Sequence, residues 1–546
     1  MDRRRISFAL LASLIHACIG VPLQINFESV YEKAGTVTER PKVEPPDVFS
    51  LISASNKESN MLMREGDIAV DIGRSAIKCD DNSCRWSKNS TGIVNVPYTL
   101  SPDYSSSDKT VFLTAMEEYA TLTCVRFIER TSESDYLQIM SNSGCWSYVG
   151  KRGGGQPLSV VSGCIRQGSI QHELNHALGF FHEQSRSDRD NYINIMFNNI
   201  LPGTGGNFQK YDTLNLGTEY DYGSVMHYPS TAFSVDGSSP TIVPKPNASV
   251  PIGQRYGLST LDVSKINKLY DCGVCRTLLS DSSGSLTSSN YPNNYPGASR
   301  CLWLIRIPSN LVFLQFSAFD VQATQGCASD YLRIYDGPTT SSPMLLDKAC
   351  GAGQLPPMIS TTNTMLLEFV SDSSTEATGF KASYSTVTCG SVLTNPMGTF
   401  STPNYPSSYP PSMDCTWVLT APPGFIVSVN MTDFTLEYKS TCTFDYMLAF
   451  DGPKITSPLM GRYCGKTTPP ALTSTGNSLL IQAHSDNSIQ LKGFLAKYAF
   501  GWDPWAWARC STQTSSVHVF EHTNCEGVQR AVCPPSPPQG TVLCEP

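Results

Sequence analysis

The chain has few charged residues and few long apolar runs, and both shortages limit what it can be. Charged side chains make up 16% of its 546 residues, and the formal net charge is −8. Nucleic-acid binding needs a basic surface, so this composition argues against that class of function. After the N-terminus, no apolar stretch is long enough to span a bilayer. A chain of this length is too large for one hydrophobic core, so several domains are expected.

The apolar stretch at the N-terminus predicts a secretory signal peptide. Arg3, Arg4 and Arg5 form a basic leader before an apolar stretch from Ile6 to Ile19, and Gly20 closes it with a small residue. We therefore expect residues 1–20 to be removed and the protein to be secreted into the extracellular space. A buried N-terminal helix is the alternative, which the flanking residues disfavour.

The cysteines fit this compartment. Of nineteen cysteines, Cys18 lies in the signal peptide, which leaves an even set for a disulfide framework. Three sequons predict N-glycosylation at Asn89, Asn247 and Asn430, although sequons also occur by chance.

Residues 21–74 contain no cysteine and few packed apolar runs, and they are rich in Pro, Glu, Ser and Lys. This composition predicts a propeptide. It ends at Gly73-Arg74, where a trypsin-like protease would cut. A disordered spacer is the alternative reading of the same composition.

An internal repeat occupies residues 275–500. Tyr-Pro, Trp, Asp-Tyr, Asp-Gly and Gly-Phe elements recur at an offset of 114 or 115 residues, together with four cysteines. These cysteines are Cys275, Cys301, Cys327 and Cys350 in one copy and Cys389, Cys415, Cys442 and Cys464 in the other. Short alternating segments between turn clusters predict a β-sandwich for each copy.

Each copy resembles a CUB domain from end to end, over residues 275–388 and 389–500. CUB domains are extracellular binding modules, and the resemblance implies disulfides Cys275–Cys301, Cys327–Cys350, Cys389–Cys415 and Cys442–Cys464. No residue in either copy suggests catalysis.

The chemistry is concentrated in an eleven-residue motif from His172 to His182. His172 and His176 lie four residues apart, so on one helical face they can bind the same metal ion. Glu173 lies beside that ion as a general base, and Gly179 can end the helix with a positive φ so that His182 returns as a third ligand. Three protein ligands leave an open position for water, as a catalytic zinc site requires. The alternative, a helix with two surface histidines and an unrelated third, is disfavoured by the full motif.

A second element lies downstream, in Tyr222-Gly-Ser-Val-Met226-His-Tyr228. A lone methionine is usually core filler, but metzincins place a methionine turn below the zinc, and Met226 fits that position. With the zinc motif, this segment makes residues 75–274 resemble the astacin family of zinc endopeptidases. The implied fold is an α+β metzincin domain followed by two all-β CUB sandwiches and a small tail.

The astacin resemblance implies several further roles. Tyr228 becomes a swinging zinc ligand that steadies the transition state, and Glu183 binds the new N-terminus at Ser75. Asp67, in Arg64-Glu-Gly-Asp67, occupies the zinc in the proform, with Arg64 in place of the family's phenylalanine and therefore weaker anchoring; an ordinary exposed turn is the alternative. The family's edge strand, which pairs with substrate, maps to residues 156–160. The implied disulfides are Cys124–Cys272, Cys145–Cys164 and an extra pair, Cys79–Cys84.

The two repeats differ in candidate calcium ligands. CUB domains that bind calcium use three carboxylates, which read Glu437, Asp445 and Asp486 in the second copy. The first copy has Gln322, Asp330 and Asp372 instead. We therefore expect a calcium site in the second copy and a weaker site or none in the first, unless these acids are only solvated loop residues.

The extra cysteine pair and the two CUB domains resemble hatching enzymes, the amphibian ones in particular. We therefore expect an egg-envelope protein as substrate, held through the CUB domains. A tolloid-like processor of matrix or growth-factor precursors is the alternative, and a catalytically dead binding protein is a weaker one.

Residues 501–546 form a tail that resembles no family. Cys510, Cys525, Cys533 and Cys544 suggest a small disulfide-stapled unit with three possible pairings. A flexible appendage docked on the second repeat is the alternative. The Trp502-Asp-Pro-Trp505 segment also resembles an acceptor for tryptophan mannosylation.

Overall fold

The computed structural model describes residues 46–70, 83–254, 256–353 and 355–502. The predicted signal peptide, the first part of the predicted propeptide, the Arg74 cleavage site and the C-terminal tail lie outside these residues. Among the described residues, none of the helices combines the length and apolarity needed to cross a bilayer.

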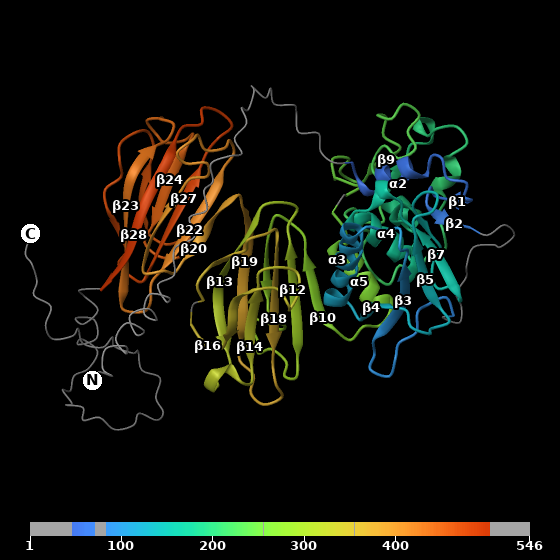
Figure 1. Cartoon of the computed structure of the whole chain (residues 1–546), viewed down its shortest axis with the longest axis horizontal. Coiled ribbons are helices and arrows are strands. Elements are labelled where there is room, and N and C mark those ends of the chain that lie inside the picture. Colours follow the sequence, from blue (N-terminus) through green and yellow to red (C-terminus); the bar gives the residue numbers. More distant parts are fainter. Residues whose placement is uncertain (1–45, 71–82, 255, 354, 503–546) are drawn as a thin grey trace, which may run out of the picture. The chain divides into compact units, whose positions relative to one another are not determined.

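The first domain is built on a twisted sheet of seven strands (Figure 1). In sheet order the strands are β1 (Met63–Arg64), β2 (Ile68–Ala69), β6 (Trp146–Ser147), β7 (Gly155–Ser159), β5 (Tyr136–Met140), β3 (Val94–Leu100) and β4 (Val125–Glu129). Strands β7, β5, β3 and β4 run parallel, whereas β6 is antiparallel to β7. The parallel strands mix apolar and polar residues, and in β5 the buried Leu137 and Ile139 flank the exposed Gln138, so only part of each strand contributes to the core.

Three helices pack in the first domain: α3 (Ser106–Leu122), α4 (Gln167–Leu178) and α5 (Thr260–Leu269). Helices α3 and α5 begin with capping boxes, formed by Ser105 with Asp108 and by Ser259 with Asp262. Helix α4 is buried from its second residue, Gly168, to its end at Leu178. Because it cannot shift in such packing, it can hold metal ligands in a fixed position.

Short elements complete this domain. They are η1 (Ser162–Cys164), η2 (Glu183–Ser185), η3 (Arg189–Asn191), β8 (Ile193–Ile195), η4 (Phe197–Asn199), η5 (Gly205–Phe208) and β9 (Ile242–Pro244). Strands β8 and β9 pair antiparallel as a separate two-stranded sheet.

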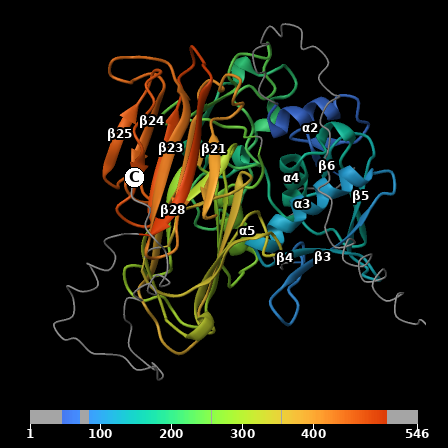
Figure 2. The same cartoon turned by 60° about the vertical axis from the view of Figure 1, so that its left-hand side comes forward.

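Residues 46–70, the described part of the predicted propeptide and here called the pro-segment, are folded onto this domain. Helix α2 (Val48–Asn56) is capped by Asp47 and packs against α4 and η1 (Figure 2). Strands β1 and β2 form a hairpin, and β2 adds to the sheet through Ile68 opposite Ser147. The predicted propeptide is therefore an ordered part of the sheet over these residues.

The edge strand differs from the expectation for residues 156–160. Those residues overlap β7, which pairs with β5 along its length and with β6 at Leu158 and Ser159. Strand β6, which begins directly after Cys145, pairs antiparallel with the end of β7 and therefore forms the edge of the domain's own sheet. The pro-segment uses this edge, since the Ser147 amide donates to the Asp67 carbonyl at 3.1 Å.

The first repeat is a sandwich of two sheets. One sheet contains β10 (Cys275–Leu279), β12 (Arg300–Arg306), β18 (Thr364–Val370), β14 (Tyr331–Tyr335) and β15 (Met344–Ala349). The other contains β11 (Ser283–Thr287), β19 (Gly379–Val387), β13 (Leu311–Val321), β16 (Gly351–Ala352) and β17 (Met358–Ile359), and η6 (Gln325–Cys327) precedes β14.

The second repeat has the same architecture. Its sheets contain β20 (Cys389–Leu393), β22 (Asp414–Thr420), β27 (Ser478–His484), β24 (Tyr446–Phe450) and β25 (Leu459–Tyr463), and β21 (Met397–Ser401), β28 (Gly493–Trp502), β23 (Phe425–Thr435) and β26 (Leu472–Thr473). The predicted α+β domain followed by two all-β sandwiches is confirmed.

Among the described residues, six disulfides join cysteines that the resemblances pair. They are Cys124–Cys272, Cys145–Cys164, Cys275–Cys301, Cys327–Cys350, Cys389–Cys415 and Cys442–Cys464. The pair Cys79–Cys84 lies outside the described residues because of Cys79.

Candidate metal centre and active site

The three motif histidines meet at one point in the first domain. His172 and His176 project from α4, which begins at Gln167 and ends at Gly179 with φ 111°. This positive φ is the one that the sequence predicts, and it turns the chain back so that His182 faces the helix. The Nε2 atoms of His172 and His182 lie 3.1 Å apart.

A carboxylate of the pro-segment completes the cluster. Asp67 oxygens lie 3.0 Å from His172 Nε2, 3.3 Å from His182 Nε2 and 3.6 Å from His176 Nε2. All four side chains are buried. The sequence-predicted ligand set is therefore brought together, Asp67 included.

The tautomers of His172 and His176 follow from their other ring nitrogens. His172 Nδ1 donates to the Val225 carbonyl at 2.8 Å, and His176 Nδ1 donates to the Phe180 carbonyl at 2.7 Å. Each Nε2 is then unprotonated and directs a lone pair into the cluster. Lone pairs and a carboxylate that converge in this way repel one another unless a cation lies between them.

The pKa values of two of the histidines also indicate that the cluster favours a positive charge. Burial lowers the pKa of His176 to about 4. Burial also lowers the pKa of His182, but the charges of Asp67 and Glu65 outweigh it and raise the pKa to about 10. The centre thus accommodates positive charge at His182 next to a neutral imidazole at His176.

The donor set fits zinc. Tetrahedral zinc with bonds of about 2.0–2.1 Å separates its ligand atoms by about 3.3 Å, close to the distances here. Three imidazole nitrogens and one carboxylate oxygen are ligands that zinc takes.

Glu173 lies next to the cluster without binding it. Its side chain is fully buried, and neither carboxylate oxygen has a hydrogen-bond partner among the described residues. Burial, reinforced by the charge of Asp67, raises the pKa of Glu173 well above its usual value. A buried carboxylate of raised pKa is suited to accept and return a proton.

Met226 and Tyr228 lie close to the third histidine in the chain's fold, and the Tyr228 ring is 4.7 Å from that of His182. Met226 is buried, and its carbonyl accepts a hydrogen bond from the Glu183 amide at 3.1 Å. The Tyr228 hydroxyl donates to the backbone oxygen of Glu65, so the pro-segment engages this residue directly.

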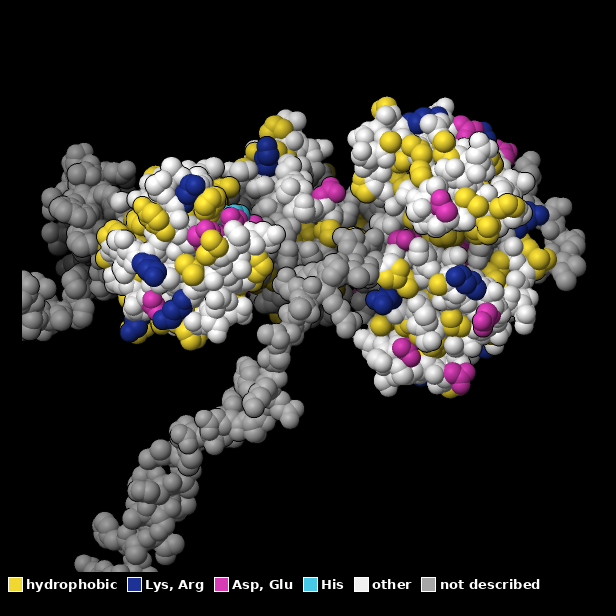
Figure 3. All heavy atoms as spheres, turned by 90° about the horizontal axis from the view of Figure 1, so that it is seen from above, with side chains coloured by type: hydrophobic (Ala, Val, Ile, Leu, Met, Phe, Trp, Pro, Cys, Tyr) yellow, Lys and Arg dark blue, Asp and Glu magenta, His cyan; other side chains and the backbone are white. Residues whose placement is uncertain are grey.

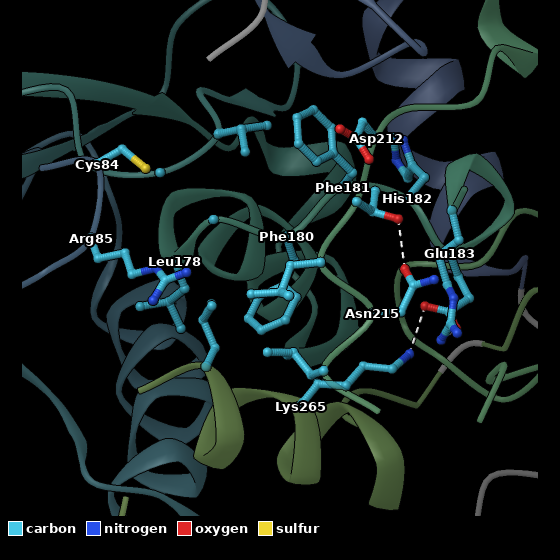
Figure 4. Close-up of a pocket in the computed structure, with 18 residues that line it drawn as sticks. Cys84, Arg85, Leu178, Phe180, Phe181, His182, Glu183, Asp212, Asn215 and Lys265 are labelled. Carbon is cyan, nitrogen blue, oxygen red and sulfur yellow. Dashed lines mark hydrogen bonds and ion pairs between the residues drawn. The ribbon is translucent and has the colours of Figure 1, made fainter. Parts of the chain in front are cut away.

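Glu183 already has cationic partners in this structure. Its Oε2 accepts from Lys265 Nζ at 2.6 Å, and its Oε1 accepts from Arg186 Nη1 at 3.1 Å and the Asp221 amide at 2.8 Å. Lys265 reaches Glu183 across a pocket of about 170 Å³ (Figure 4). The expected partner, the amine of Ser75, lies outside the described residues.

The second repeat gathers the three carboxylates expected there. Ligand oxygens of Glu437, Asp445 and Asp486 lie within 4.8 Å of one another. Burial and the charges of the two aspartates raise the pKa of Glu437, and burial raises that of Asp445. Such a cluster of acids is stabilised by a hard divalent cation.

The first repeat places Gln322 where the second has Glu437. The Gln322 amide donates to Ser374 Oγ at 3.3 Å, and hydrogen bonds from Ser374 lower the pKa of Asp372. No comparable acidic cluster forms among the described residues of this repeat.

The predicted glycosylation sites are accessible. The side chains of Asn89, Asn247 and Asn430 are all exposed.

Comparison with known proteins agrees with this architecture. The family model "Astacin (Peptidase family M12A)" matches residues 79–271, and the CUB domain model matches residues 272–384 and 389–498. Embryonic protein UVS.2 of Xenopus laevis is 47% identical over 514 residues, which cover 91% of this chain and 99% of that protein. This chain belongs to the astacin family. It is therefore a metalloendopeptidase, and the astacin family is zinc-dependent. It also carries two CUB domains, here called CUB1 (residues 272–384) and CUB2 (residues 389–498).

Two further relatives lie within the same family. Astacin-like metalloendopeptidase of Gallus gallus is 44% identical over 68% of this chain and 95% of its own length. High choriolytic enzyme 1, described as a hatching enzyme zinc-protease of Oryzias latipes, is 49% identical; it covers 36% of this chain and 100% of its own, with a TM-score of 0.35.

Sequence reasoning missed how the astacin pro-segment is anchored. The prediction of weaker anchoring considered only Arg64 and did not consider Phe49 in α2. The Phe49 ring lies 4.2 Å from that of Tyr228 and 5.3 Å from that of Phe233. Asn56 adds a polar clamp, since its side chain bonds both the amide and the carbonyl of Cys145. The apolar residues Val48, Phe49, Leu51 and Ile52, clustered inside a polar segment, were the available signal.

Sequence reasoning also missed what holds the methionine turn. Asp262 of α5 accepts hydrogen bonds from the Val225 amide at 2.9 Å and the Ser224 hydroxyl at 2.6 Å. Gln184 accepts from the Tyr228 amide at 3.1 Å. These contacts fix the turn below the histidines, and no local pattern indicates them.

Proposed function

We propose that this astacin-family enzyme is a secreted zinc endopeptidase that cleaves an egg-envelope glycoprotein after activation. The observation that carries the chemistry is the convergence of three histidine Nε2 atoms beside Glu173, whose carboxylate has no hydrogen-bond partner among the described residues. Six disulfides among the described residues fit an oxidising, extracellular compartment.

Each residue has a defined part in peptide hydrolysis. Zinc bound by His172, His176 and His182 would polarise the scissile carbonyl and acidify water. Glu173 accepts the proton of that water and returns it to the leaving amine. The Tyr228 hydroxyl, released from Glu65 when the pro-segment leaves, can donate to the developing oxyanion.

Substrate binding uses the sheet edge that the pro-segment occupies. An extended peptide can add to β6 through the Ser147 amide, where Asp67 now accepts a hydrogen bond. CUB2 provides a second contact: calcium held by Glu437, Asp445 and Asp486 would order its loops for binding protein. A weak second contact raises the effective concentration of substrate at the active site.

The egg-envelope assignment rests on domain content. The chain matches the embryonic protein UVS.2 over nearly the whole of both chains, two CUB domains included. Tolloid-like protein 2 of Mus musculus is 37% identical, but the match covers only 41% of its length. The net charge of −8 favours a protein substrate over nucleic acid, and on the face shown in Figure 3 the Lys and Arg side chains lie among other residue types.

The test of the activity is a Glu173→Gln variant of the cleaved enzyme. The glutamine amide cannot accept a proton, so peptide hydrolysis should fall by about 100-fold or more while zinc content stays at one per chain. Glu117→Gln, an equivalent change at an exposed position of α3, is the matched control. Near-normal hydrolysis by Glu173→Gln would refute the assigned base.

The test of the substrate offers the cleaved enzyme three proteins side by side. Egg-envelope protein, procollagen and casein should be cut in that order of rate. Faster cleavage of procollagen would favour a tolloid-like function, and no cleavage of any protein would favour a binding protein.

Latency follows from the same geometry. We propose that Asp67 fills the water position at the zinc until a trypsin-like protease cuts after Arg74. In an Arg74→Ala background that prevents cleavage, Asp67→Ala should hydrolyse a fluorogenic peptide that the parent leaves intact. Glu58→Ala, at an exposed acid of the same segment, is the control. If Asp67→Ala is as inert as its parent, Asp67 does not impose latency.

A further inference from the structure

The three zinc-site histidines differ in what holds their outer ring nitrogens. For His172 and His176 the acceptors are the carbonyls of Val225 and Phe180, which belong to the astacin domain. For His182 the acceptor is the Glu65 carboxylate, at 2.5 Å from Nδ1. The third ligand thus takes its outer partner from the segment that activation removes.

Glu65 is held in place by the burial of its side chain and by hydrogen bonds of its backbone amide and carbonyl. Its side chain is buried, with 1% of its surface exposed. Its amide donates to Asn207 Oδ1 at 3.0 Å, and its carbonyl accepts from the Tyr228 hydroxyl. The carboxylate is therefore fixed at His182 by its own backbone, independently of the position of the Asp67 side chain.

An acceptor at this position changes the ligand itself. A carboxylate that accepts the Nδ1–H of a metal-bound histidine fixes the ring orientation and makes Nε2 a stronger donor. Substitution of such outer partners typically weakens metal binding by about 10–100-fold. A carboxylate does this more strongly than a neutral carbonyl because of its charge.

We propose that Glu65 is a positioning residue of the zinc site, contributed by the pro-segment, and that it makes the proform hold zinc more tightly than the cleaved enzyme does. The inference rests on the zinc site proposed above. It adds to the role of Asp67, because Asp67 contacts the metal side of the histidines and Glu65 the opposite side of one of them. Activation then removes two carboxylates from the centre, one on each side of His182.

Zinc release measures this directly. The proform carries Glu173→Gln, so that it cannot cleave itself, and is mixed with excess chelating dye. Glu65→Ala should release zinc about 10–100-fold faster than the parent. Glu65→Gln, whose amide oxygen can still accept the Nδ1–H without the charge, should fall between them. Glu58→Ala should match the parent.

Cleavage after Arg74 provides an internal control. It yields the same mature chain from every variant, so all release rates should then become equal and faster than that of the uncleaved parent. A difference that persisted after cleavage would mean misfolding and would overturn the inference. So would release from Glu65→Ala and Glu65→Gln proforms at the parent rate.

The two levels of failure can be told apart. A parent proform without stoichiometric zinc would refute the zinc site itself. A parent that holds zinc, with release indifferent to residue 65, would refute only the role of Glu65. If Glu65→Ala is not secreted, the near-isosteric Glu65→Gln still decides the question.

Discussion

CUB1 and CUB2 share the framework of one loop cluster but differ in its charge. In both, a buried tyrosine donates its hydroxyl to a buried aspartate: Tyr295 to Asp330 at 2.6 Å, and Tyr409 to Asp445. The other oxygen of each aspartate accepts the amide of the late-loop aspartate at 2.8 Å. The framework therefore does not depend on whether calcium is to be bound.

What differs is the third side chain. Gln322 in CUB1 donates to Ser374 and carries no charge, whereas Glu437 in CUB2 adds a carboxylate; each side chain has one buried oxygen without a partner among the described residues. The three acids of CUB2 repel one another, whereas CUB1 has only two acids at these positions. A serine donates in the same way to the late-loop aspartate of each domain, Ser374 to Asp372 and Ser488 to Asp486, so these bonds do not distinguish the domains. One residue on a common framework thus separates a candidate metal site from an ordinary loop cluster.

The surrounding surface differs in the same direction. Next to the acids of CUB2, Tyr438, Phe444 and Ile489 expose 74%, 36% and 59% of their surfaces. Ala323, Ser329 and Thr375 stand at the equivalent positions of CUB1. Exposed apolar side chains beside charged ones are typical of protein-binding surfaces, so this contrast favours CUB2 as the docking domain.

Glu437→Gln should remove the difference in ligand charge between CUB2 and CUB1, and we expect it to have the largest effect on calcium binding. It leaves the backbone framework intact but removes one of three negative ligands, so calcium affinity should fall by about 10-fold or more. The measurement is calorimetric titration of calcium into the full-length chain carrying Glu173→Gln. Asp281→Asn, at an exposed acid of CUB1, makes the same change in net charge and should leave affinity unchanged. If the two variants bind calcium with equal affinity, Glu437 is not a calcium ligand and the site does not lie in CUB2.

Gln322→Glu should create in CUB1 the three-carboxylate calcium site that we expect in CUB2. Asp330 and Asp372 are oriented by the same bonds as their CUB2 equivalents, so the added carboxylate should raise the stoichiometry from one calcium per chain to about two. The new site should bind within about 10-fold of CUB2. If the stoichiometry stays at one, side-chain charge alone does not decide between the two domains, and the loop backbone does.

Much of this arrangement follows from sequence because its determinants are local or repeated. His172 and His176 share a face through helical spacing, and Gly179 turns the chain within the same motif. The carboxylates of CUB2 were found through the resemblance to calcium-binding CUB domains, and the repeat supplied the equivalent positions in CUB1 for comparison. Spacing of this kind is visible without knowledge of the tertiary fold.

The features that were missed depend on contacts between distant residues. Glu65 meets His182 117 residues along the chain, and Asp262 clamps Val225 from 37 residues away. The edge strand was misassigned because β6 has only two residues and is identified by its pairing. Neither partner of such a contact carries a pattern that points to the other.

The smallest expected effect is on domain stability, and it distinguishes the hydrogen-bonded tyrosine–aspartate framework from the bound calcium. Removing the hydroxyl in Tyr295→Phe or Tyr409→Phe leaves a buried aspartate oxygen without its donor, which should cost about 1–3 kcal/mol of domain stability. In CUB2 calcium can compensate, since it binds the folded domain and neutralises the aspartate. Scanning calorimetry with EGTA and with saturating calcium should show Tyr295→Phe lowering one transition equally in both conditions. Tyr409→Phe should lower a different transition, and less when calcium is present. If calcium protects both variants equally, CUB1 binds the ion as well, and the two domains are not distinguished by Gln322 and Glu437.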